Sequence, residues 1–113
     1  MKKNNLILRL SRFSERVLFC CRKIKWDLIN RPIIFQLVKS STSVGANYLE
    51  SQNAISRKDF RNKIYICKKE INETKYWLVL LGKDNVANRE ELRKLYIECV
   101  ELIKIFQSIT SKL

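Results

Sequence analysis

Apolar residues recur in steps of three and four along nearly the whole chain, the spacing that places side chains on one face of an α-helix. One series runs from Leu6 to Leu28, and others begin at Ile34, Phe60 and Leu92. Turn-forming residues are scarce, because the 113 residues include only 2 Gly and 1 Pro. A β-sandwich, a barrel or a Rossmann-type fold needs a turn signal about every 8 to 12 residues. Long helices are therefore the architecture that remains.

Short signals separate the apolar series. Pro32 disfavours helical conformation at the preceding residue and suits the first turn of the next helix. Ser56 stands three residues before Asp59, a spacing typical of a helix start, whereas Gly82 is typical of a helix end. Because the connections are short, we predict an all-α, antiparallel, up-down-up-down four-helix bundle that forms a single domain over residues 1–113. Its helices are predicted at about 5–28, 32–54, 57–81 and 89–111.

The second series contains a run of small and polar residues, Ser40-Ser41-Thr42-Ser43-Val44-Gly45-Ala46-Asn47. Ser, Thr, Gly and Asn are mediocre helix formers, so local propensity favours a loop here. The apolar periodicity on both sides favours a helix instead. Small side chains allow another backbone to approach closely. We therefore predict a tight helix–helix contact at this run, in which the hydroxyl groups have hydrogen-bond partners.

The chain carries 23 Lys or Arg against 11 Asp or Glu, a formal net charge of +12. The excess lies mainly in residues 1–39 and 57–69, which predicts a basic face that attracts polyanions. A solvated face without any ligand is the alternative. The candidate phosphate contacts on the first helix are Arg9, Arg12, Arg16, Arg22, Lys23 and Lys25. The third helix is predicted to extend the same surface with Arg57, Lys58, Arg61 and Lys68.

The composition argues against an enzyme and against a bound metal or cofactor. The chain has no His, and so lacks both the Glu-x-x-His motif of di-iron bundles and the usual general base. Neither glycine opens a phosphate-binding loop. The four Cys show no CxxC spacing, and we interpret them as reduced thiols of a cytoplasmic protein. Arg9 and Arg12 interrupt the first apolar run, so the sequence predicts neither an export signal nor a membrane span.

A hairpin that turns near residues 54–56 places polar residues of its two helices opposite each other. Glu50 then faces Lys63, and Ser43 faces Glu70. We predict a buried polar network that fixes the register of this hairpin, because a buried charge without a partner is strongly destabilising. The alternative is a binding site around Glu70 and Glu73. The predicted network consists of Ser43, Asn47, Glu50, Lys63, Lys69, Glu70 and Glu73.

The same two helices carry a family resemblance. The motif is Thr42-Ser43-Val44-Gly45-Ala46-Asn47-Tyr48-x-Glu50, followed by Lys58-Asp59-Phe60, Lys69-Glu70, Glu73-Thr74 and Tyr76-Trp77-Leu78. The chain resembles the bacterial four helix bundle proteins. These were first recognised as reading frames in intervening sequences of 23S rRNA genes, and they share their fold with the accessory variability determinant (Avd) of diversity-generating retroelements. Ser41 stands where the family usually has Gly, and Ser51 where it has Ala, so both departures keep a small side chain.

The resemblance implies a homo-oligomer, a pentameric ring of bundles with a positively charged surface, and no catalytic residues. In the retroelement proteins the basic ring binds a reverse transcriptase and nucleic acid. We therefore predict a non-enzymatic nucleic-acid-binding accessory protein whose ligand is RNA. The alternative is a protein-interaction scaffold that docks an acidic partner such as a reverse transcriptase. A membrane-surface role for the first helix is disfavoured, because the bundle needs its apolar stripe, and no membrane partner is predicted.

Overall fold

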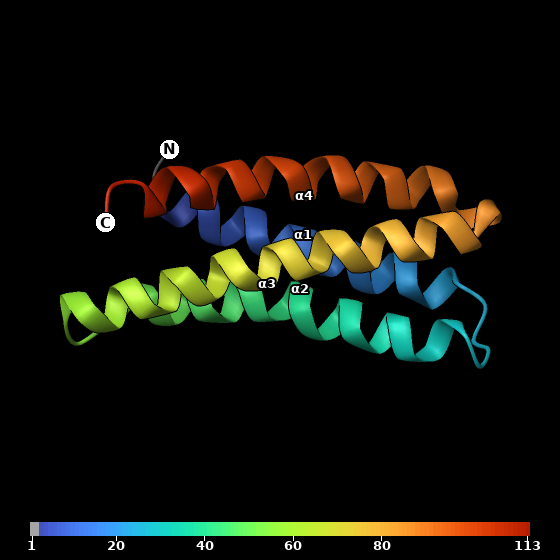
Figure 1. The fold of residues 1–113 in the computed structure, drawn as a ribbon, viewed down its shortest axis with the longest axis horizontal. Helices are drawn as coiled ribbons and strands as arrows, with labels where there is room; N and C mark the ends of the chain where they lie inside the picture. Colours follow the sequence, from blue (N-terminus) through green and yellow to red (C-terminus); the bar gives the residue numbers. More distant parts are fainter. Residues whose placement is uncertain (1–2) are drawn as a thin grey trace.

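The computed structural model describes residues 3–113, with side chains from residue 5 onward, as four helices joined by short connections (Figure 1). The helices are α1 (Lys3–Lys23), α2 (Asn30–Gln52), α3 (Arg57–Asp84) and α4 (Arg89–Thr110), and a single 3-10 turn, η1 (Val86–Asn88), precedes α4. The described residues contain no strand. The bundle measures 44 × 24 × 20 Å. The predicted all-α class is confirmed, while residues 1 and 2 of the predicted domain lie outside the described part.

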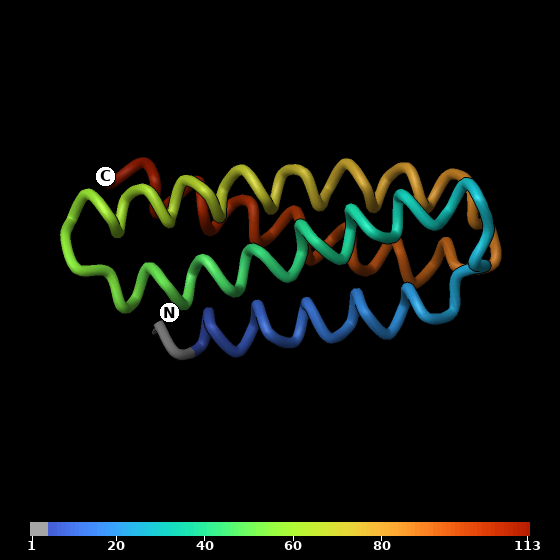
Figure 2. Tube along the Cα trace, turned by 90° about the horizontal axis from the view of Figure 1, so that it is seen from below, coloured from blue at the N-terminus to red at the C-terminus, as the bar shows by residue number. Residues whose placement is uncertain are grey.

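Successive helices run antiparallel. The α2–α3 turn lies at the same end of the bundle as both chain ends, and the other two connections lie at the opposite end (Figures 1 and 2). α2 packs against α1 and α3, and α4 packs against α3 and, less extensively, against α1. α1 and α3 are therefore diagonal to each other. None of the described helices is both long enough and apolar enough to cross a membrane.

The first helix ends five residues earlier than predicted, at Lys23. A polar turn begins α2 instead: Asp27 Oδ1 accepts hydrogen bonds from the backbone N–H groups of Ile29 and Asn30 at 3.1 and 2.7 Å. The Asn30 side chain then donates to the Lys25 carbonyl and to Asn85 Oδ1, which ties this turn to the end of α3. Pro32 lies inside the first turn of α2, where its missing N–H needs no partner.

The third helix passes through Gly82, so the prediction that this residue ends it is wrong. No described glycine has a positive φ, and α3 continues to Asp84. Asn85 ends the helix, because its backbone N–H and its side-chain amide both donate to the Leu81 carbonyl at 3.0 Å. The start of α3 is as predicted, since Ser56 Oγ accepts from the Asp59 N–H at 3.0 Å. α2 ends at Gln52 and α4 at Thr110, within two residues of the predicted ends.

The small-residue run is helical, and its hydroxyl groups have partners. Thr74 Oγ1 lies 2.9 Å from Ser40 Oγ across the contact between α2 and α3, and both residues are buried. Nearby, the Cys67 thiol donates to the Val44 carbonyl at 3.4 Å. On the other side of α2, a Cβ added at Gly45 would lie 3.8 Å from Leu10 Cβ. Small residues thus let α2 approach both neighbours closely, as predicted.

Candidate nucleic-acid interface

The basic residues of α1 lie beside α4, and the first of them is already paired. Arg9 donates through Nε and Nη2 to the two carboxylate oxygens of Glu98 at 2.7 and 2.8 Å. This hydrogen bonding raises the pKa of Arg9, against a smaller opposite effect of burial. Two-point pairing with a carboxylate is a strong form of ion pair. Arg9 therefore joins α1 to α4, and its guanidinium is less available to a ligand than that of an arginine without an ion pair.

A second link between the same helices involves Lys23. Its Nζ lies 3.2 Å from Glu91 Oε2 and 4.3 Å from the centre of the Phe19 ring. Both side chains of this ion pair are more than a third exposed, so solvent weakens it. Arg9 and Lys23 thus each have an acidic partner on α4, about four turns of α1 apart.

Three arginines lie between or beside these links without an ion pair among the described side chains: Arg12, Arg16 and Arg22. They line a groove of about 630 Å³ together with Leu18 and Phe19 of α1 and the acidic residues Glu15 and Glu91. Arg12 and Arg16 also line a second hollow of about 460 Å³ beside Glu98. The two hollows lie side by side, because they share Arg12 and Arg16, and we call the first of them the α1–α4 groove.

The remaining predicted contacts do not join the α1–α4 groove. Arg57, Lys58, Arg61 and Lys68 belong to α3, which is diagonal to α1, so they do not extend the α1 surface as expected. Arg57 and Arg61 instead line a hollow of about 480 Å³ at the end of the bundle, beside Lys112. Lys25 lies beyond the end of α1, in the connection to α2. The structure thus divides the predicted basic surface into two regions.

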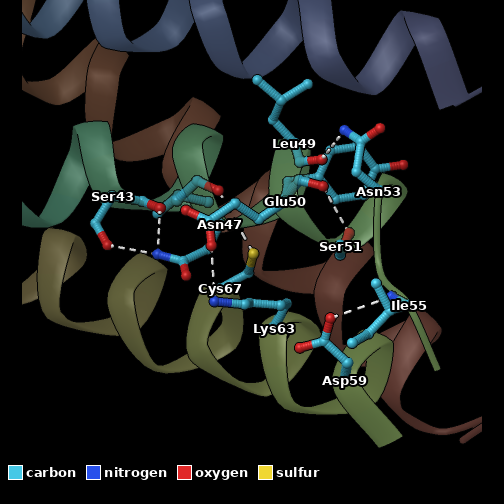
Figure 3. A network of polar contacts seen from close by, with 12 residues as sticks. Ser43, Asn47, Leu49, Glu50, Ser51, Asn53, Ile55, Asp59, Lys63 and Cys67 are labelled. Atoms are coloured by element: carbon cyan, nitrogen blue, oxygen red, sulfur yellow. Dashed lines mark hydrogen bonds and ion pairs between the residues drawn. The ribbon is translucent and has the colours of Figure 1, made fainter. Parts of the chain in front are cut away.

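The predicted polar network is only partly formed (Figure 3). Lys63 Nζ lies 2.7 Å from Glu50 Oε1, as expected, and the hydrogen bond and charge of Glu50 raise the pKa of Lys63. The pair is not buried, however, because 58% of the Glu50 side chain is exposed. Ser43 does not meet Glu70: the Asn47 side chain donates to both Ser43 Oγ and the Ser43 carbonyl at 2.9 Å. A partner one turn away in the same helix needs less ordering than one on a neighbouring helix.

Glu70 therefore lies outside the network. Its carboxylate is 17% exposed, and Lys69 Nζ is 4.0 Å away. Burial, and then the neighbouring Glu73, raise the pKa of Glu70. Glu73 itself is exposed and has no ion pair among the described side chains. The Trp77 indole N–H is buried and has no acceptor among the described atoms.

The four thiols are buried in the described bundle and form no disulfide. Loss of solvation raises the pKa of Cys20 to about 11 and that of Cys21, Cys67 and Cys99 to about 12. At neutral pH they are therefore protonated and poorly nucleophilic. Their position on apolar helix faces explains this, since a protonated thiol packs as a small apolar group.

The sequence model of the family described as 23S rRNA-intervening sequence protein matches residues 11–108. The chain belongs to this family. The match covers both the small-residue run of α2 and the whole of α3, the stretches that carried the resemblance. None of the curated proteins matches the chain.

A solved structure supports the same assignment. It is the 1.70 Å crystal structure of a protein of unknown function of the S23 ribosomal protein family from Bacteroides thetaiotaomicron VPI-5482. The two chains are 34% identical, the alignment covers 98% of this chain and 99% of the other, and the TM-score is 0.83. The four-helix arrangement is thus shared over nearly the full length.

Two features of the groove were missed at the sequence level. Glu91 and Glu98 neutralise Lys23 and Arg9, and Phe19 stands exposed among the arginines. A signal for the acidic residues was present, because Glu91 and Glu98 are seven residues apart and their partners Arg9 and Lys23 are fourteen apart. Side chains seven or fourteen residues apart project from nearly the same helix face. Complementary charges at this spacing on two neighbouring helices indicate ion pairs between them.

Proposed function

We propose that this protein is a non-enzymatic, homo-oligomeric accessory protein that binds nucleic acid, with RNA as its ligand, in the cytoplasm. The observation that carries the proposal is the α1–α4 groove with its three unpaired arginines, Arg12, Arg16 and Arg22. Arginine binds phosphate through several N–H donors at once, and its charge does not depend on pH in the physiological range. Four buried, unoxidised thiols fit a reducing compartment.

The spacing of these arginines suits an extended polyanion. A rise of 1.5 Å per residue separates Arg12 from Arg16 by about 6 Å along α1, and Arg22 lies about 9 Å further on. Each of the three can therefore hold a different phosphate. Glu15 is the acidic residue in the groove that has no ion pair among the described side chains, so the positive charge prevails there.

A titration of labelled RNA tests the proposal. We expect binding at about 50 mM salt that weakens steeply by about 200 mM, because phosphate contacts release counterions. The slope of the logarithm of the binding constant against the logarithm of the salt concentration reports how many counterions are released on binding. In the variant Arg12→Ala/Arg16→Ala/Arg22→Ala this number should fall by about two. The matched control is Arg57→Ala/Lys58→Ala/Arg61→Ala, which removes the same charge from the diagonal helix. No binding at low salt, or equal losses in both variants, would contradict the proposal.

Self-association is the second part of the proposal. Large apolar side chains are exposed on all four helices and on the connection after α1, among them Leu8, Trp26, Leu28, Leu49, Tyr76 and Ile97. Aromatic residues are enriched where subunits meet. We propose a pentamer, as the family resemblance implies. Light scattering at several protein concentrations gives the mass directly, and a mass of one chain at all of them would contradict this part.

A scaffold that docks an acidic protein, such as a reverse transcriptase, is the second candidate. One observation favours it: α3 and α4 enclose a groove of about 540 Å³ lined by Leu78, Val79, Leu92 and Tyr96, with Lys83, Arg89 and Arg93 beside them. An apolar floor beside basic residues suits an acidic, amphipathic helix. The test uses protein from which nucleic acid has been removed by nuclease. If an acidic partner binds this protein and Leu92→Glu abolishes the binding, the scaffold function is favoured over RNA binding. Leu92 is 1% exposed, so the variant must first be shown to fold.

A further inference from the structure

An exposed aromatic ring lies inside the most basic part of the α1–α4 groove. Phe19 is 57% exposed, although it belongs to a helix whose opposite face is fully buried. It lines the groove together with Arg12, Arg16 and Arg22. The Lys23 ammonium lies over one face of this ring, 4.3 Å from its centre, and the same ammonium pairs with Glu91.

Packing of the core does not require this position. A buried Phe stabilises a core, whereas a half-exposed ring among arginines leaves apolar surface in water. The core face of α1 is complete without it, since Phe13, Val17 and Cys20 are all almost fully buried. A flat aromatic face beside phosphate-binding cations is the combination with which proteins hold unpaired bases of a nucleic acid strand.

We propose that the α1–α4 groove binds single-stranded RNA, with one base stacked on Phe19 and the neighbouring phosphates held by Arg12, Arg16 and Arg22. This inference rests on the proposed function and adds the form of the ligand. A duplex cannot use the ring, because its base faces are stacked on each other and its deep groove excludes side chains. In a single strand, the bases can turn towards the ring while the phosphates stay with the arginines.

Five of the seven residues that line the groove are charged, so it suits a charged ligand better than a purely apolar one. Of its lining residues, only Leu18 and Phe19 are apolar, and the rest are three arginines and two carboxylates. An acidic peptide could meet the arginines, but it would gain nothing from a ring that protrudes among them, since a carboxylate is not attracted to the negative face of an aromatic ring. A base, by contrast, stacks on the face of the ring that Lys23 does not cover.

The test compares an unstructured single-stranded RNA with the duplex of the same sequence, by fluorescence anisotropy on the full chain at low salt. We expect tighter binding of the single strand. Phe19→Ala should weaken single-strand binding about tenfold, the effect of losing one stacked base, and should leave duplex binding unchanged. Phe19→Trp should restore the affinity. The matched control is Phe35→Ala, which removes a ring of similar exposure (63%) from α2 and should change neither affinity.

The outcomes separate this inference from the proposed function. If neither RNA form binds at low salt, both fail. If both forms bind equally and Phe19→Ala changes nothing, nucleic-acid binding stands and base stacking is wrong. A change in the oligomer mass of Phe19→Ala, with the single-strand preference intact, would assign the ring to a contact between subunits and overturn the inference. Equal binding of inorganic polyphosphate and single-stranded RNA would also overturn it, since polyphosphate has no bases.

Discussion

The contact between α2 and α3 differs from the contact between α1 and α4 in how the helices meet. Between α2 and α3 the contact is close and made by small residues, with Ser40 and Thr74 joined through their buried hydroxyl groups. Between α1 and α4 the contact is less extensive and includes the ion pairs of Arg9 and Lys23. We call the α2–α3 contact the closed seam and the α1–α4 contact, which has hollows beside it, the open seam.

The difference shows how one small bundle can combine a close-packed contact with a more open one. A close-packed, hydrogen-bonded seam fixes the geometry of the α2–α3 hairpin. The more open seam between α1 and α4 is held at its ends by charged side chains, and the arginines between them stay accessible. The motif that carries the family resemblance lies on the closed hairpin, while the proposed site lies on the open pair.

The largest effect should follow from enlarging a side chain in the closed seam. Ser40 is 3% exposed, so Ser40→Leu has to displace packed atoms and also removes a buried hydroxyl. We expect a loss of about 2 to 4 kcal/mol in the free energy of unfolding, measured by urea denaturation. Ser11→Leu on the exposed face of α1 is the control and should change stability by less than about 0.5 kcal/mol. A Ser40→Leu protein as stable as the parent would show that the seam is not close-packed.

The buried thiol of the closed seam predicts a loss of stability in alkali. Burial raises the pKa of Cys67 from 9.0 to about 12, so this thiol stays protonated in the folded protein while it ionises in the unfolded chain. The stability that this difference in pKa gives the folded protein is fully present below pH 9. It is lost as the pH rises towards 12, by about 1.4 kcal/mol per pH unit.

Urea denaturation from pH 7 to pH 10.5 checks this for the parent protein and Cys67→Ala. The difference in unfolding free energy between them should narrow above pH 9, because the variant lacks the ionising thiol. Curves that stay parallel over this range would contradict the prediction.

The Arg9–Glu98 ion pair of the open seam should contribute less to the free energy of unfolding than either of the two changes above. Arg9 and Glu98 are 33% and 19% exposed, so solvent screens their attraction. A double-mutant cycle with Arg9→Met and Glu98→Gln should give a coupling of about 1 kcal/mol. The exposed pair Glu101–Lys104 serves as the control, with about 0.3 kcal/mol expected. Equal couplings would show that Arg9 is as free for a ligand as any surface cation.

The smallest expected effect is a gain in stability. Gly82 lies within α3, beside the groove between α3 and α4, and a Cβ added there would meet nothing within 4 Å. Gly82→Ala should therefore stabilise the protein by about 0.5 to 1 kcal/mol, since Gly is a poor helix former. Thermal unfolding followed by circular dichroism measures the change. A loss of stability would show that the added methyl group meets a neighbour after all.

Apolar periodicity and the scarcity of turn residues were sufficient to predict the helix number, the antiparallel order and most of the core. Helix ends were predicted less well where a single residue was taken as the signal. Pro32 and Gly82 are both compatible with helix at their positions, so the ends depend on Asp27 and Asn85, whose side chains accept or donate the terminal hydrogen bonds. The candidate site was predicted only in part, because net charge does not show which cations already have partners.

The sequence by itself determined a basic four-helix bundle, because helical periodicity and formal charge are properties of the chain read in order. Only the tertiary structure decided which arginines are available. Glu98 and Glu91 are far from Arg9 and Lys23 in sequence, and folding alone brings them within 3.2 Å or less. The same packing places α3 diagonal to α1 and so divides the basic residues between two surfaces. Ion pairing and helix order in space depend on contacts between distant segments, which no local pattern fixes.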